Sequence, residues 1–343
     1  MQPIHTVHDF FLRSGAQLRL FHMGRRVTPF GLDTLAAFEN GTLPWPQPWR
    51  SQARMACVFT LGDSPEPIIW FLAMPLDEQG HLMPAPRDAF VQRLLETLGR
   101  IVERQNQAED GAAENLMEGN PLSFEPSLPF RAMLHARATR AFDRPASQHL
   151  ELVEAYLQGQ QDEAHWQALG LQGMADYVIR QDTEQSRQLA DRLDALPSDV
   201  VRTLCYCLEH EPLDESLVIA LRARGEAAAQ HGDVETLCAC VRAVGTSVSD
   251  TTLKWYDALL ADTHASGPDL LAAMAARGWE HLEDAERLPR FLQRLAEHPG
   301  ADFLALVRDL ALIPRLRLPV LMSLREAPAD SAIGQRLAAL HQA

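Results

Sequence analysis

The chain has 343 residues, 46% of them hydrophobic, and a formal net charge of −15. This length predicts about two domains with a sizeable core, and the charge argues against general affinity for nucleic acid or for anionic membranes. We expect no secretory signal, because residues 1–15 lack a basic start followed by an apolar run. We also expect no membrane span, and five cysteines, an odd number, favour a reducing cytoplasm.

The first hundred residues predict a small α+β module, residues 1–104, with about three strands. Segments of helical spacing are mixed there with runs rich in branched and aromatic residues. Gly41 stands where a helix over 32–39 would stop. In chain order we expect a helix over 6–13, a strand within 18–27, a helix over 32–39, strands over 53–61 and 68–74, and a helix over 87–104.

Residues 105–130 are acidic, contain Gly and Pro, and show little periodicity, which predicts a linker or long loop. Residues 131–343 show only helical patterns, separated by prolines and glycines. Ser249 and Pro268 are suited to helix starts.

Two copies of a short sequence suggest how the helices of residues 131–343 are arranged. Residues 203–208 read TLCYCL and residues 236–241 read TLCACV, an offset equal to one helix-turn-helix unit. We therefore predict a HEAT-like helical-repeat array, with an irregular helical bundle as the alternative.

The two C-x-C pairs are the most tempting metal ligands: Cys205 with Cys207, and Cys238 with Cys240. On a helix, residues two apart point about 200° away from each other, so both thiols of a pair cannot face one ion. Zinc sites usually use a C-x₂₋₄-C spacing instead. We predict buried core cysteines and no metal site or cofactor.

No catalytic constellation is visible in the sequence. The stretch FTLGDS, residues 59–64, is similar to the nucleophile block of GDSL-type hydrolases, but no D-x-x-H is present to supply a base for Ser64. We therefore expect a hairpin loop there. Glu209, His210 and Glu211 lie at a predicted helix end, where a solvated cluster is the ordinary expectation. The common nucleotide, metalloprotease and serine-elbow motifs are absent, so we predict no catalytic residue.

Two surface features are candidates for binding a partner. Arg137, Arg140 and Arg144 have helical spacing in an otherwise acidic region. We expect them to pair with the acidic segment 103–125, and the alternative is a docking face for an acidic partner. The segment LPWPQPWR, residues 43–50, holds Trp45 and Trp49. We expect these tryptophans to cover the module's own sheet, and the alternative is a docking site.

Three segments carry a family resemblance: LRLFHMGRRVTPF, FENGTLPWPQPW, and IWFLAMPLDEQGHLMPAPRDAFVQRLLE from Ile69 to Glu96. They resemble an uncharacterised family of proteobacterial proteins of about 340 residues, catalogued as a domain of unknown function. The resemblance implies a bacterial cytoplasmic protein. It implies no catalytic residue, cofactor or partner.

We therefore predict a non-enzymatic protein-interaction scaffold or adaptor of unknown partner, because helical arrays present extended binding surfaces. The alternative is a hydrolase or transferase with an unrecognised site between the two domains. A cleft that holds a carboxylate or histidine with a strongly shifted pKa would favour the enzyme. A third reading, nucleic-acid binding confined to the arginine face, would show a steep salt dependence.

Overall fold

The computed structural model describes residues 4–61, 66–103, 117, 119–161, 163–263 and 267–340. The chain divides into two compact units. The first, the N-terminal unit, is Met1–Ser127 with Leu312–Pro314, and the second, the helical unit, is Leu128–Ala311 with Arg315–Ala343. An α+β unit is followed by a helical one, so the predicted fold class is confirmed.

The N-terminal unit is built on an antiparallel sheet with the strand order β2-β1-β3-β4. Four strands are present among the described residues, where the sequence predicted about three. The missed strand is short and contains Pro29, which an edge strand tolerates because its outer N–H groups need no ladder partner. The strands are β1 (Gln17–His22), β2 (Thr28–Phe30), β3 (Gln52–Thr60) and β4 (Ile68–Pro75).

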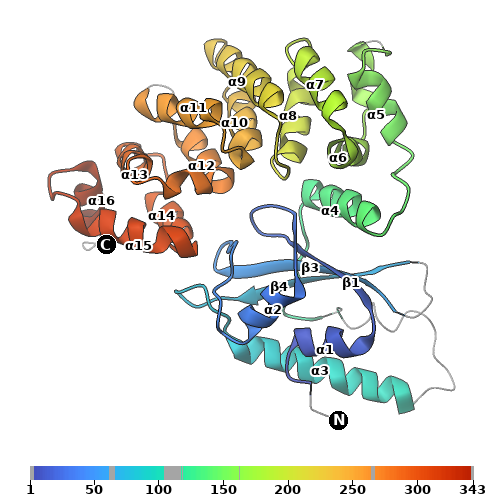
Figure 1. The fold of residues 1–343 in the computed structure, drawn as a ribbon. Coiled ribbons are helices and arrows are strands. Elements are labelled where there is room, and N and C mark those ends of the chain that lie inside the picture. The colour runs from blue at the N-terminus through green and yellow to red at the C-terminus, as the bar shows by residue number, and fades with distance from the viewer. Residues whose placement is uncertain are drawn as a thin grey trace. The chain divides into compact units, whose positions relative to one another are not determined.

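Three helices cover one face of this sheet (Figure 1). Leu20, Met55 and Trp70 from the strands form one hydrophobic core with Phe11 and Phe90 from the helices. Burial of these apolar side chains is the main driving force for the fold of this unit. The helices are α1 (Val7–Ser14), α2 (Leu32–Glu39) and α3 (Pro84–Glu103).

Glu39 joins the three helices at one point. Its carboxylate accepts the backbone N–H groups of Val7, at 3.0 Å, and His8, at 2.8 Å, in the first turn of α1. It also accepts a hydrogen bond from Arg87 of α3, at 3.0 Å. A buried carboxylate at a helix N-terminus is favourable because it satisfies unpaired N–H groups and complements the helix dipole.

The helical unit contains α-helices and short 3₁₀ turns, and no strand is found among its described residues. Ser249 caps α11 by accepting the N–H of Thr252, and Pro268 begins α12, as predicted. The helices are α4 (Leu128–Ala141), α5 (Leu150–Leu157), α6 (Leu171–Arg180), α7 (Thr183–Arg192), α8 (Ser198–Leu208), α9 (Glu215–Gln230), α10 (Val234–Ala243), α11 (Asp250–Ala261), α12 (Pro268–Arg277), α13 (Arg287–Glu297), α14 (Phe303–Ala311), α15 (Pro314–Glu326) and α16 (Ala332–Leu340), with 3₁₀ turns η1 (Glu163–Ala168), η2 (Val244–Thr246) and η3 (Trp279–Glu283).

These helices stack in two rows. In one row α4, α6, α8, α10 and α12 each contact the next, and in the other α7, α9, α11 and α13 do the same (Figure 1). The two copies of the TLC sequence lie on α8 and α10, which are neighbours in the first row. In a stacked array, each helix packs against the next helix but one in the chain, as it does here. That the repeats are of the HEAT-like kind stays a prediction.

Among the described residues, none of the helices combines the length and the apolar character needed to span a membrane.

Candidate functional site

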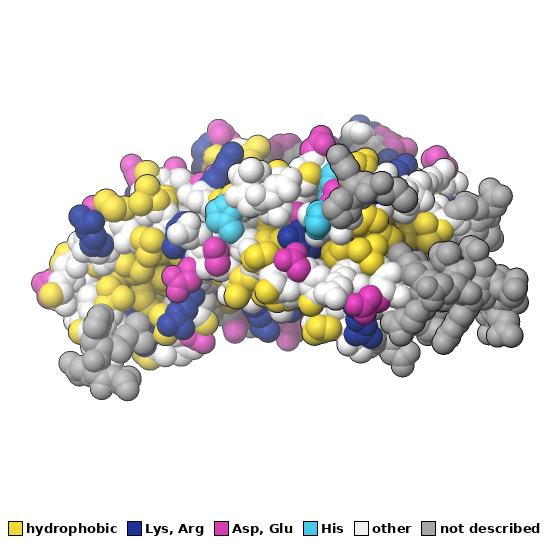
Figure 2. Space-filling view, turned by 90° about the horizontal axis from the view of Figure 1, so that it is seen from below, with side chains coloured by type: hydrophobic (Ala, Val, Ile, Leu, Met, Phe, Trp, Pro, Cys, Tyr) yellow, Lys and Arg dark blue, Asp and Glu magenta, His cyan; other side chains and the backbone are white. Residues whose placement is uncertain are grey.

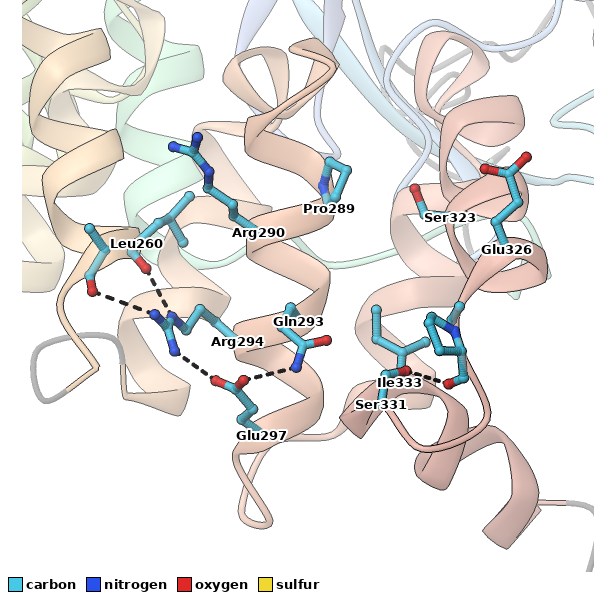
Figure 3. A pocket seen from close by; sticks show the side chains of 13 residues that line it. Leu260, Pro289, Arg290, Gln293, Arg294, Glu297, Ser323, Glu326, Ser331 and Ile333 are labelled. Atoms are coloured by element: carbon cyan, nitrogen blue, oxygen red, sulfur yellow. Dashed lines mark hydrogen bonds and ion pairs between the residues drawn. The ribbon is translucent and has the colours of Figure 1, made fainter.

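A groove opens to solvent near the C-terminal end of the helical unit (Figure 3). Its volume is about 780 Å³. Leu260 at the end of α11 and Pro289, Arg290 and Arg294 of α13 line one side. Residues from the end of α15 and the start of α16 line the other, among them Glu326 and Ile333. The two walls of the groove therefore come from segments that are far apart in the chain, between residues 260 and 333.

Hydrogen bonds connect the side chains of the α13 wall to one another and to the end of α11. Arg294 donates from Nε to the carbonyl oxygen of Leu260, at 2.9 Å, and from Nη1 to Glu297, at 2.8 Å (Figure 3). Gln293 donates to the other carboxylate oxygen of Glu297, at 2.9 Å. The hydrogen bond from Gln293, assisted by Arg294, lowers the pKa of Glu297, so this carboxyl stays ionised. A carboxylate held in this way is a poor proton donor at neutral pH.

The opposite wall mixes apolar and polar groups. Ile333 is buried, and Ser331 donates from Oγ to the carbonyl oxygen of Pro328, at 2.7 Å. On the α13 wall, Arg290 is exposed and forms an ion pair with Glu286, one turn earlier in the chain, at 3.0 Å. All lining residues are described, and none of them is a histidine or a cysteine. The groove thus offers apolar contact and the exposed charges of Arg290, Glu297 and Glu326 to whatever enters it.

Sequence reasoning missed this groove. Arg290, Arg294 and Glu297 repeat along α13 at three- and four-residue spacing, which is also the pattern of an ordinary solvated helix face. Nothing in the local sequence distinguishes the two cases, because the second wall comes from α15 and α16.

The predicted arginine face is used inside the helical unit. Arg137 forms an ion pair with Glu211 and donates to the carbonyl oxygen of His210, at 2.8 Å. Arg140 donates to the carbonyl oxygen of Ile179. We expected these arginines to pair with the acidic segment 103–125, most of which lies outside the described residues. The structure shows Arg137 bound to the loop after α8 instead. This contact arises because α4 packs against α6 and α8.

Arg144 is half-buried, and its carbonyl oxygen accepts a hydrogen bond from Arg180 of α6, at 2.8 Å. Its backbone thus fastens the end of α4 to α6.

Glu209 and His210 are buried, so the expectation of a solvated cluster is wrong. Glu209 accepts hydrogen bonds from Nε of Arg242, at 2.7 Å, and from Nε of Arg277, at 2.6 Å. Burial by itself raises the pKa of Glu209, but Arg277 and Arg242 outweigh it and lower the pKa to about 2. The ring of Phe130 packs edge-on against His210. This network ties the ends of α8, α10 and α12 together.

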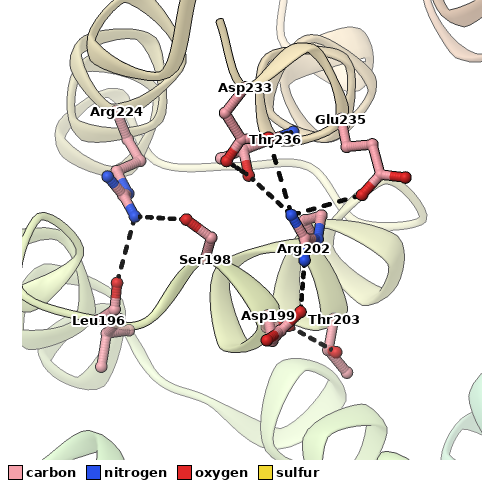
Figure 4. A network of polar contacts seen from close by, with 9 residues as sticks. All are labelled: Leu196, Ser198, Asp199, Arg202, Thr203, Arg224, Asp233, Glu235 and Thr236. Carbon is pink, nitrogen blue, oxygen red and sulfur yellow. Dashed lines mark hydrogen bonds and ion pairs between the residues drawn. The ribbon is translucent and has the colours of Figure 1, made fainter. Parts of the chain in front are cut away.

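A second polar network lies at the other ends of α8 and α10 (Figure 4). Arg202 of α8 contacts Asp199 on its own helix, and reaches Asp233 at 3.7 Å and Glu235 at 3.5 Å across to α10. Asp233 caps α10 by accepting the N–H of Thr236, at 3.0 Å. Exposed ion pairs of this kind contribute little to stability, and those from Arg202 to Asp233 and Glu235 link α8 with the start of α10.

The two tryptophans of residues 43–50 differ in exposure. Trp45 is fully buried and packs against Phe38 and His22, with ring centroids 4.8 Å away in both cases. Trp49 is half-buried, and the guanidinium of Arg25 lies 5.4 Å from the centre of its ring. Trp45 therefore covers the module's own core and presents no surface to a partner, which leaves Trp49 as the accessible member of the pair.

Ser64 and the rest of the GDSP turn lie outside the described residues.

A family model described as "Protein of unknown function (DUF3549)" matches residues 2–341. The chain belongs to this family. The resemblance to an uncharacterised family is thereby confirmed across both units, and the description of the family assigns no activity, ligand or partner. No curated protein and no solved structure matches the chain.

The cysteine pairs of this DUF3549 chain lie on helices, as predicted. Cys205, Cys207 and Cys240 are fully buried, and Cys238 is half-buried. Burial raises the pKa of Cys205, and a hydrogen bond with Cys240 raises it further. Burial likewise raises the pKa of Cys207 to about 12. Metal binding needs thiolates, and Cys205 and Cys207 remain protonated thiols at neutral pH.

We expect the purified DUF3549 chain to contain no stoichiometric zinc or iron. The thiols of each pair point to different sides of their helix, and burial raises the pKa values of Cys205, Cys207 and Cys238. Elemental analysis of the purified protein checks this directly, and thermal melts with and without a chelator should coincide. One metal ion per chain, or unfolding caused by the chelator, would show that the cysteines have been misinterpreted.

Proposed function

We propose that the protein is a non-enzymatic protein-interaction scaffold or adaptor, and that a segment of a partner protein binds in the groove between α11, α13, α15 and α16. The observation that carries the proposal is the groove itself: it is open, its volume is about 780 Å³, and both walls are helices of a packed unit. Helical arrays commonly bind partners through surfaces of this kind.

The groove walls are preorganised. Arg294 is fixed by the C-terminal carbonyl groups of α11 and by Glu297, and Ser331 is fixed by Pro328. A partner that binds to such walls loses its own freedom but orders little of the protein, which reduces the entropy cost of binding. The exposed Arg290 and Glu326 supply charges of opposite sign that select and orient the partner segment.

The side chains of the groove favour binding over the alternative of a hydrolase or transferase site in the groove itself. That alternative needs an activated nucleophile, or an acid or base whose pKa is shifted toward neutrality. In the groove, Glu297 has a lowered pKa, and the hydroxyl of Ser331 donates to a carbonyl oxygen. Neither group is placed to activate the other.

As part of the proposal we place the protein in the cytoplasm of a bacterium, without general affinity for nucleic acid or membrane. The five cysteines are free thiols, and four of them are buried. A reducing compartment maintains that state. The net charge of −15 opposes binding to phosphate-rich surfaces.

Charge reversal in the groove tests the proposal. We expect Arg290→Glu and Glu326→Arg each to weaken binding of the partner about tenfold or more, because each replaces an attractive charge with a repulsive one. The measurement is quantitative mass spectrometry of proteins retained from an extract of the organism's own cells, followed by titration of the purified partner. Both residues are exposed, so the melting temperature should not change.

The matched controls are Lys254→Glu and Asp250→Arg. These residues form an exposed pair four residues apart on α11, as Arg290 and Glu286 do on α13. A protein retained by the wild type and by both controls but lost with the groove variants supports the proposal. The same set of proteins retained by every variant would exclude the groove as the binding site.

A further inference from the structure

The outward face of α15 is apolar although nothing among the described residues covers it. Leu318, Leu321 and Met322 are 67%, 46% and 37% exposed, and their spacing of three and four residues places them on one side of the helix. Leu316 and Val320, which point inward, are fully buried. Single exposed apolar residues are common, whereas three in one stripe on one helix form a continuous surface.

The surface view in Figure 2 shows an apolar area in the same part of the helical unit. Hydrophobic side chains gather at the left of Figure 2, in the part where Figure 1 places α15 and α16, and charged side chains surround them. Terminal helices of a stacked array usually carry a polar outer surface, because they have no further neighbour to cover them. The apolar stripe of α15 departs from that rule.

A cation stands at each end of the stripe. The side chain of Arg315 is 80% exposed and makes a surface pair with Glu283, at 3.1 Å. Arg325 is exposed ten residues later, about 15 Å further along the helix. Glu283 beside Arg315 is only 27% exposed, and Glu326, the exposed carboxylate next to Arg325, lines the groove. At each end of the stripe the cation is therefore the charge that borders the apolar side chains.

We propose that this face of α15 binds an amphipathic helix of a partner protein whose apolar stripe has acidic residues at both ends. Binding of the apolar face of an amphipathic helix to an apolar protein surface is a common mode of peptide recognition. Carboxylates at the two ends of the partner helix complement Arg315 and Arg325 and fix its register. The inference goes beyond the groove, because it concerns a different face of α15 and states the chemistry of the partner.

The charges argue against a second copy of this chain as the occupant. If two copies of α15 packed antiparallel about the centre of the stripe, Arg315 of one copy would lie opposite Arg325 of the other. If they packed parallel, each arginine would face its own counterpart. Like charges at both ends disfavour either arrangement. An anionic membrane is disfavoured by the net charge of the whole chain.

Binding of designed helical peptides to the full-length protein tests the inference. The probe is a fluorescent 18-residue peptide with leucines at a spacing of three and four residues and glutamates at both ends of the stripe. A second peptide carries lysines in place of the glutamates, and a third carries serines in place of the leucines. By fluorescence anisotropy, we expect the acidic peptide to bind about tenfold more tightly than the basic one, and the serine peptide not to bind.

Variants of α15 locate the binding site. Leu318→Ser with Leu321→Ser should weaken binding of the acidic peptide about tenfold or more, and Arg325→Glu should remove the preference for acid over base. The matched control is Ile219→Ser on α9, where the side chain is 53% exposed and outside the stripe. All these side chains are exposed, so thermal melts should show unchanged folding.

Other outcomes overturn the inference. Equal binding of the acidic and basic peptides, or binding that survives the double serine variant, rules out the proposed partner. A dimer seen by light scattering that dissociates in the double serine variant assigns the face to a second copy, and binding to phosphatidylserine vesicles assigns it to a membrane. Arg290→Glu should leave peptide binding intact, so failure of this inference is distinguishable from failure of the groove proposal.

Discussion

Replacing Glu209 with glutamine is expected to lower the free energy of unfolding by about 3–5 kcal/mol at pH 7, because it leaves two cations without their anion in a buried site. Glu209 is 2% exposed and accepts hydrogen bonds from Arg242 and Arg277. Glutamine has the same shape as glutamate, so the variant creates no cavity and isolates the effect of charge. Urea denaturation of the full-length protein measures the difference.

The pH dependence gives an independent check. The pKa of Glu209 falls from its ordinary value of 4.5 to about 2 in the folded protein. A lowered pKa means that the stabilisation is fully present above about pH 4.5 and is lost as the pH falls toward 2. A shift of this size corresponds to about 3 kcal/mol. The difference in unfolding free energy between wild type and Glu209→Gln should therefore be constant from pH 7 to about 5 and shrink below that.

The matched control is Glu235→Gln, which removes a carboxylate whose side chain is 79% exposed on α10. An exposed pair is worth little, so this variant should melt with the wild type at every pH. If Glu209→Gln were no less stable than the control, the buried network would contribute nothing to stability. In that case the junction of α8, α10 and α12 would be held by apolar packing alone.

The burial of Glu209 also shows what the sequence could not predict. Arg242 and Arg277 lie 33 and 68 residues beyond it, and only the stacking of α8, α10 and α12 brings them together. From the sequence, a charged cluster before Pro212 has the pattern of a solvated helix end. Helix starts, in contrast, depend on neighbouring residues, so Ser249 and Pro268 could be assigned correctly.

In the N-terminal unit, too, features set by neighbouring residues could be predicted and features set by distant contacts could not. The helix over 32–39 was predicted residue for residue, because the glycine at 41 with φ of 71° marks its end locally. Strand β2 was missed because three residues with a central proline carry almost no strand signal, and only pairing with β1 defines it. The groove of the helical unit escaped prediction for the same reason, since its two walls come from distant parts of the chain.

Replacing Trp45 with alanine is expected to cost about 3–5 kcal/mol, the usual range for a buried tryptophan in a core. Its indole is fully buried against Phe38, His22 and Phe30, and its backbone N–H donates to the carbonyl oxygen of Gly80, at 2.8 Å. The backbone bond would survive the substitution, whereas the ring contacts would be lost and a cavity left. The N-terminal unit should therefore melt much earlier, or the variant should fail to accumulate in soluble form.

Trp49→Ala in the same segment is the matched control, because this side chain is half-buried and rests on the guanidinium of Arg25. It should be clearly less destabilising than Trp45→Ala, since less apolar surface returns to water. The comparison separates the two roles of the segment LPWPQPWR. If Trp45→Ala folded and melted like the wild type but lost a partner, its burial in the core would be refuted, and residues 43–50 would become a docking site.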